Sequence, residues 1–193
     1  EERFIFVDMP ENIKLLSKIV LGYDKYTSKA GWIIEHETPV AKQQKIHQIH
    51  SGTLKTILND KPNYVTLDNF KIAPIMRLWQ QVNKIAIFYM FIAEFELLKR
   101  EFPNWTNDPN EFAERDDLVY LGQFVSSREG VNLSTADYMV MFNIPFSSVS
   151  YQQSIQRIVT KNREKPAIVY WIMTKGGIEE KIYKIVTDKR KYT

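Results

Sequence analysis

The sequence predicts an α/β fold with a doubly wound, mainly parallel sheet flanked by helices. Short apolar runs without polar alternation predict strands that are buried on both faces. Amphipathic segments with helical spacing alternate with these runs, as in βαβ units. The chain of 193 residues, 44% hydrophobic and 25% charged, has the composition of a globular domain with a full core.

Five apolar runs are predicted to be strands: Arg3–Val7, Ile85–Met90, part of Leu118–Val125, Tyr138–Phe142 and Ala167–Met173. Six segments between and after them are predicted to be helices: Glu11–Val20, Pro39–His50, Ile72–Val82, Ile92–Phe102, Val149–Ile158 and Ile178–Lys189. The second helix has the clearest boundaries. Thr38 is a candidate N-cap, Pro39 fits the first helical position, and Gly52 follows the end.

Two segments have weaker patterns. Lys55–Thr66, with a turn at residues 59–62, is expected to form a small hairpin, and Phe102–Arg115 is expected to be a loop with about one helical turn. No interior domain boundary is visible, so residues 1–193 are expected to form a single domain. The abrupt start at Glu1 suggests a fragment of a longer protein.

Composition excludes several classes of function. The chain has no cysteine, which excludes disulfides and thiolate chemistry and fits a reducing, cytoplasmic setting. The longest apolar run, Ile85–Ala93, is too short to cross a bilayer, so no membrane association is expected. The net charge of +3 is compatible with a polyanionic partner without requiring one.

Motifs for self-contained nucleotide chemistry are missing. None of the seven glycines precedes lysine, so the chain has neither a phosphate loop nor a dinucleotide-binding turn, and it has no adjacent Asp-Glu pair. A lone hydrolase or methyltransferase is therefore poorly supported. His47 and His50 are spaced to share a helix face, but without a clear third ligand they are expected at a partner-facing or exposed surface. No metal site is predicted.

A first polar stretch, SSREGVNLSTAD at residues 126–137, follows a predicted strand. Ligands bind at the carboxyl ends of strands in such sheets. Ser126, Ser127 and Arg128 could bind phosphate oxygens, and Gly130 would allow close backbone approach. A capped turn, in which the serines and Asn132 satisfy local backbone groups, explains the same residues equally well.

A second polar stretch, SYQQSIQRIVTKNREK at residues 150–165, follows the next predicted strand. On a helix, Gln153, Gln156 and Arg157 would share one face, opposite an apolar face. A guanidinium in a fixed polar row is well suited to phosphate. The alternative is a solvated face with an ordinary surface arginine.

These stretches resemble conserved motifs of the second RecA-like domain of superfamily-two helicases of the Swi/Snf-like kind, as found in phages. GQFVSSREGVNLSTADYMVMFN resembles motif V, SYQQSIQRIVTKNR resembles motif VI, and KIAIFYMFIAEFELL resembles motif IV. RFIFVDMPE resembles the strand that opens this domain, and GGIEEKIYKIVTDKR resembles its closing helix. The resemblance covers nearly the whole chain, with the motifs in the family's order.

The resemblance implies roles for matching residues. Gln153 and Arg157 would face ATP and Mg²⁺ bound mainly by an absent N-terminal RecA-like domain, with Gly130 and Asn132 at the cleft between the domains. Ser126, Ser127 and Arg128 would contact the backbone of DNA, with RNA as a possibility. The family's second arginine, three residues after the first, is replaced by Thr160. Lys161 or Arg163 could substitute, and Arg163 is favoured because it has a guanidinium.

The resemblance thus implies the C-terminal motor domain of an ATP-dependent DNA helicase or translocase, inactive on its own. The alternative is a non-catalytic nucleic-acid-binding or interaction module that keeps the RecA-like fold. Thr160 and the modest charge favour the alternative, whereas Gln153 and Arg157 favour the motor.

Overall fold

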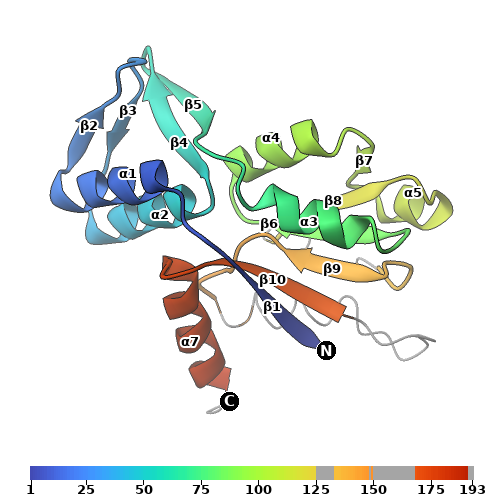
Figure 1. Cartoon of the computed structure of the whole chain (residues 1–193). Coiled ribbons are helices and arrows are strands. Elements are labelled where there is room, and N and C mark those ends of the chain that lie inside the picture. Colours follow the sequence, from blue (N-terminus) through green and yellow to red (C-terminus); the bar gives the residue numbers. More distant parts are fainter. Residues whose placement is uncertain (125–132, 148, 150–167, 191–193) are drawn as a thin grey trace.

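The computed structural model describes residues 1–124, 133–147, 149 and 168–190. They form a six-stranded sheet and a four-stranded sheet with helices around them (Figure 1). No helix in these ranges is long and apolar enough to span a bilayer.

The larger sheet is parallel in every pairing between its described strands. Its order is β1-β10-β9-β6-β8-β7. The bounds of these strands are β1 Glu2–Val7, β6 Ile85–Tyr89, β7 Trp105–Thr106, β8 Val119–Gln123, β9 Tyr138–Met141 and β10 Ile168–Thr174. The predicted doubly wound, mainly parallel sheet is confirmed.

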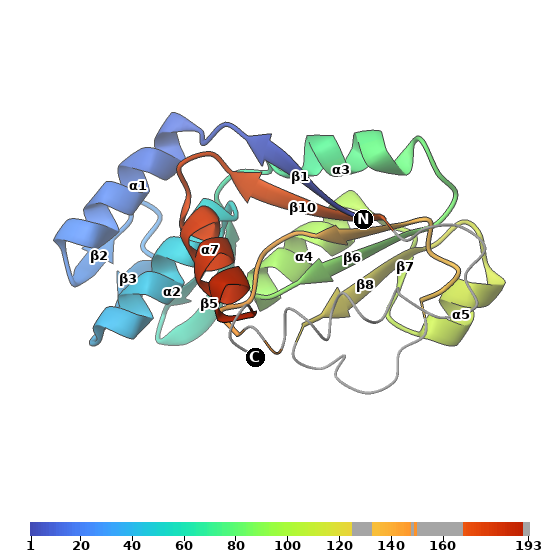
Figure 2. The ribbon, with the colours of Figure 1, turned by 90° about the horizontal axis from the view of Figure 1, so that it is seen from below.

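Alternate residues of the central strands enter two different cores. Phe88 and Trp171 face the core that includes α7 (Ile178–Arg190) and α5 (Pro109–Glu114). Ile87 and Ile172 face the core that includes α3 (Ile72–Trp79) and α4 (Ile92–Glu101). Figures 1 and 2 show α3 and α4 on one side of this sheet and α7 on the other. Burial on both faces explains the unbroken apolar runs of these strands.

The small lobe (residues 11–66) adds a layer that the sequence only partly predicts. It contains α1 (Glu11–Gly22), α2 (Pro39–His50) and the antiparallel sheet β2-β3-β4-β5. The bounds of its strands are β2 Lys25–Thr27, β3 Ile33–Glu35, β4 Thr53–Leu58 and β5 Lys61–Thr66. The lobe has its own core, to which Ile13, Ile49 and Leu54 belong. Figures 1 and 2 show the lobe beside the carboxyl edge of the larger sheet.

Local signals placed α2 correctly. The Thr38 hydroxyl accepts a hydrogen bond from the Ala41 backbone N–H at 3.2 Å, and Pro39 occupies the first turn. Gly52, just past the helix, has φ +83°. A Cβ there would lie 2.3 Å from the Asp68 carbonyl oxygen, so this turn requires glycine.

Several predicted boundaries were wrong by a few residues. The hairpin turns at Asn59 and Asp60, which both have positive φ, and β5 already begins at Lys61. Two consecutive residues of this conformation form the tight turn that matches the twist of the flanking strands. Helix α3 ends at Trp79, and the segment 102–115 contains β7 as well as α5. Of the predicted helix Val149–Ile158, the structure describes only Val149.

Candidate functional site

The carboxyl edge of the larger sheet is the expected place for a ligand. Strands β8 and β9 lie on either side of β6 and run parallel to it. The chain leaving β8 is tied to β6 by a 3.0 Å hydrogen bond from the Phe124 N–H to the Tyr89 carbonyl. The chain leaving β9 is tied there by a 2.9 Å bond from the Phe142 N–H to the Phe88 carbonyl. The chain segments that lead toward the two predicted polar stretches therefore leave the sheet at neighbouring strand ends.

The predicted site residues themselves lie outside the described residues: Ser126, Ser127, Arg128, Gly130, Asn132, Gln153, Arg157 and Arg163. Their roles stay predictions. At this edge, the structure describes the residues at the strand ends, where the chain departs toward the two polar stretches. It also describes the side chains that hold these strand ends in place.

A buried polar bridge of three side chains, His47, Asn143 and Glu94, connects the end of β9 to the end of β6 and to α2. The Asn143 Nδ2 donates to Glu94 Oε1 at 2.6 Å, and the other Glu94 oxygen accepts from the N–H groups of Met90 and Phe91 at 2.8 and 3.0 Å. The Asn143 Oδ1 accepts from the Ile144 N–H at 2.8 Å and from His47 Nε2. We call this group the Asn143 bridge.

The two histidines correct a prediction. His47 and His50 were expected at a surface, but both are buried. His50 Nδ1 accepts a 2.9 Å hydrogen bond from the Ile178 N–H, where α7 begins. They face inward because this end of α2 packs against the residues that follow β9 and β10, a long-range contact that helix spacing cannot reveal.

Burial determines the protonation of both rings. It lowers the pKa of His47 to about 3 and that of His50 to about 4, and the nearby Lys71 ammonium adds to both shifts. The rings are therefore neutral at pH 7. Because Asn143 Oδ1 is an acceptor, His47 carries its proton on Nε2, and its Nδ1 has no hydrogen-bond partner among the described residues.

A second buried contact lies beside the Asn143 bridge. Lys71 directly precedes α3, and its ammonium is 2.5 Å from Glu179 Oε1 in the first turn of α7. It also donates to the Phe142 carbonyl at 3.2 Å. The predicted helix beginning at Ile178 is confirmed. Glu179 and Glu180 lie in its first turn, where Glu179 is a buried ion-pair partner rather than a solvated charge.

Sequence reasoning missed the polar residues of this edge. Glu94 was hidden within the apolar motif IV stretch, although an acidic residue in a helix first turn is a known capping signal. Asn143 is the last residue of the stretch that resembles motif V and was given no role, although it directly follows the predicted strand Tyr138–Phe142.

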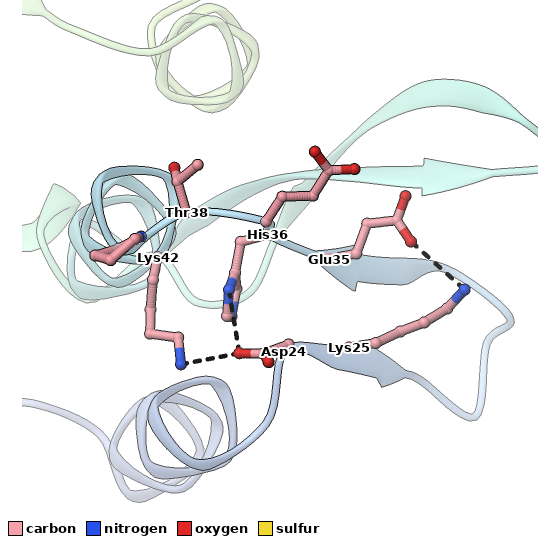
Figure 3. Close-up of a pocket in the computed structure, with 8 residues that line it drawn as sticks. Asp24, Lys25, Glu35, His36, Thr38 and Lys42 are labelled. Carbon is pink, nitrogen blue, oxygen red and sulfur yellow. Dashed lines mark ion pairs between the residues drawn. The ribbon is translucent and has the colours of Figure 1, made fainter.

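A separate cavity of about 500 Å³ lies in the small lobe (Figure 3). Four of its charged lining residues pair with one another: Lys42 Nζ lies 3.2 Å from Asp24, and Lys25 Nζ lies 3.4 Å from Glu35. Such pairing leaves little net field for a charged ligand. In the described part of the chain, no three His, Cys, Asp or Glu side chains are grouped to hold a metal ion.

Comparisons with known proteins agree with this architecture. No family model matches the chain. An uncharacterized ATP-dependent helicase of Bacillus subtilis, YqhH, is 31% identical over 167 residues, which cover 77% of this chain and 29% of that protein. A putative helicase of Invertebrate iridescent virus 6 is 25% identical over 188 residues, covering 77% of this chain and 30% of that protein. The chain thus spans less than a third of these relatives.

Solved structures show the same fold. The C-terminal domain of the Sulfolobus solfataricus SWI2/SNF2 ATPase aligns with 98% of this chain and 86% of its own, with a TM-score of 0.59 and 15% identity. These relatives and structures do not bear on a phage origin, which stays a prediction. The chain is thus similar in sequence to ATP-dependent helicases and similar in fold to the C-terminal domain of a Swi2/Snf2-type ATPase.

Proposed function

We propose that this chain is the C-terminal motor domain of an ATP-dependent DNA helicase or translocase. The observation that carries the proposal is where the chain leaves the sheet on its way to the two polar stretches. It leaves the carboxyl edge on both sides of β6, at Phe124 and at Phe142, where ligands of open α/β sheets bind. Its homology to ATP-dependent helicases supports the use of a nucleotide.

In this proposal, Gln153 and Arg157 face ATP and Mg²⁺ held mainly by the N-terminal RecA-like domain, and Gly130 and Asn132 lie at the cleft between the domains. Arg157 and Arg163 stabilise the charge that develops on the transferred phosphate, a role that contributes about 10³–10⁵ in rate. The chain has no lysine-bearing phosphate loop, so it does not hydrolyse ATP alone.

Ser126, Ser127 and Arg128 contact the nucleic-acid backbone in this proposal, which makes binding independent of base sequence. A solved Sulfolobus solfataricus SWI2/SNF2 ATPase core in complex with double-stranded DNA shares the fold, with a TM-score of 0.64 over 99% of this chain at 15% identity. This fold relationship supports DNA as the partner. RNA is an outcome that the binding measurement distinguishes.

The decisive experiment uses a protein that contains both RecA-like domains. Arg157→Ala should abolish ATP turnover and leave DNA binding largely intact, whereas Arg77→Ala, at an exposed arginine on α3, should change neither. If Arg157→Ala removes DNA binding instead, Arg157 is a backbone contact. Turnover by residues 1–193 alone would reject the motor-domain proposal.

Thr160 favours a second candidate, a non-catalytic module that binds nucleic acid or another protein. If that candidate is right, DNA should not stimulate ATP turnover in the two-domain protein. Arg157→Ala and Arg163→Ala should then have no effect on any activity of the partner to which the module binds.

A further inference from the structure

We infer that Asn143 is a positioning residue for the proposed nucleotide-facing segment that follows β9, acting through the Asn143 bridge. The inference rests on the proposed function, because it concerns turnover by the same site. It adds Asn143, Glu94 and His47, none of which belongs to the residues proposed to contact ATP or DNA.

Every group of Asn143 is used in one orientation. Its oxygen accepts from His47 and from the Ile144 N–H, and its nitrogen donates to Glu94. Turning the amide over would place donor against donor on one side and acceptor against acceptor on the other. The side chain therefore has a single satisfied orientation.

The bridge lies where water cannot replace its hydrogen bonds. Asn143 is 1% exposed, and His47 and Glu94 are 0% exposed. A buried polar network costs desolvation and is strongly disfavoured when only partly satisfied. Such a network contributes a defined geometry more than it contributes stability.

The bridge fixes the end of β9, where the chain departs toward the proposed site, against the end of the neighbouring strand β6. Glu94 holds the N–H groups that follow β6, and Asn143 holds the Ile144 N–H that follows β9. In the sequence, the chain runs from Ile144 toward Gln153 and Arg157. A displacement of about 1 Å at a catalytic group costs roughly 10²-fold in rate, so the departure point of this segment matters for turnover.

A pair of reciprocal substitutions tests the bridge. Asn143→Asp sets a carboxylate against Glu94 Oε1, where the present donor–acceptor distance is 2.6 Å. Glu94→Gln sets an amide nitrogen against Asn143 Nδ2. The double variant Asn143→Asp/Glu94→Gln reverses that one hydrogen bond, retains acceptors for His47, Ile144, Met90 and Phe91, and keeps the net charge.

Hydrogen exchange on residues 1–193 first tests the bridge itself. The amide protons of Met90, Phe91 and Ile144 should exchange at least tenfold faster in each single variant and recover in the double variant. Unchanged exchange in the single variants would show that the bridge does not hold these strand ends, and would overturn the inference.

Turnover in the two-domain protein then tests positioning. Each single variant should lower kcat by about 10- to 100-fold, with little change in the KM for ATP, and the double variant should recover to within about threefold of wild type. If the loss of kcat only matches the fraction of unfolded protein, or if the double variant does not recover, the bridge has a structural role only and the inference is overturned.

The wild-type two-domain protein separates this failure from failure of the proposed function. If it shows no ATP turnover, the proposed function is rejected, and the positioning role with it. Protected amide protons at Met90, Phe91 and Ile144 would then identify the bridge as structural only.

Discussion

Lys71 and Glu179 form a buried ion pair that joins α3 to α7, with 2.5 Å between the ammonium and the carboxylate Oε1. Both side chains are 1% exposed. The second carboxylate oxygen of Glu179 has no hydrogen-bond partner in the described part of the chain. Removing one partner of such a pair is costly, because it leaves the other charge buried and unpaired. Replacing both partners by apolar side chains costs little, because the desolvation of the pair offsets much of its attraction.

Lys71→Met should therefore destabilise the chain by about 3–5 kcal/mol, since it leaves a buried carboxylate without its cation. The double variant Lys71→Met/Glu179→Leu removes both charges and should recover most of that loss. Urea denaturation of the three proteins measures this difference. A single variant as stable as wild type would show that Glu179 is neutralised in another way.

Acid should destabilise the fold through His47 and His50. Their folded pKa values, about 3 and about 4, lie below the ordinary 6.5, so between about pH 4 and 6.5 the unfolded chain binds more protons than the folded chain. The stability they contribute is complete above pH 6.5 and is lost as the pH falls, down to about 4 for His50 and about 3 for His47. Each ring adds a slope of up to about 1.4 kcal/mol per pH unit.

The control for the pH dependence is His50→Asn, whose Oδ1 can still accept from the Ile178 N–H. In this variant, the slope of the unfolding free energy against pH should be smaller than in wild type by the contribution of one imidazole ring. Denaturation at several pH values measures the two slopes. The same slope in wild type and variant would show that His50 does not titrate with folding.

Gly177 should be intolerant of a side chain. A Cβ there would lie 2.4 Å from Glu179 Oε2 and 2.8 Å from the Thr174 carbonyl oxygen, so Gly177→Ala should cost about 1–3 kcal/mol through overpacking around the buried carboxylate. Gly22→Ala is the matched control. Gly22 is the last residue of α1 and has no atom within 4 Å of its added Cβ, so this change should be neutral or stabilise by about 0.4–1 kcal/mol. Thermal unfolding of both variants decides the comparison, and equal effects would contradict the packing argument.

Arg163 should supply the guanidinium missing at Thr160. In the two-domain protein, Arg163→Ala should lower kcat by about 10³-fold or more, and Arg163→Lys should recover little, because an ammonium lacks the planar fork. Lys161→Ala is the neighbouring control and should have a small effect. The reverse pattern would assign the role to Lys161.

The sequence predicted the larger sheet well because its strands are continuous apolar runs, such as Ile85–Tyr89, whose two-sided burial leaves no polar alternation. It predicted α2 because Thr38, Pro39 and Gly52 act within one helical turn of its ends. These signals are local, so they can be read without knowing what lies nearby in space.

The rest of the small lobe could not be predicted. Strands β2 and β3 have three residues each, too few for a periodic pattern, and they form only because β4 provides a pairing edge. The candidate site was predicted only as two polar stretches beside neighbouring strands. The roles of the residues in those stretches remain predictions.

By itself, the sequence determined the class of sheet, the ends of its best-capped helix and the absence of a phosphate loop, because composition and short-range spacing fix these properties. Only the tertiary structure decided that His47 meets Asn143 and that Lys71 meets Glu179, pairs that are 96 and 108 residues apart. A polar side chain on a helix looks the same in sequence whether it faces water or a partner. Its burial depends on which distant segment packs against it.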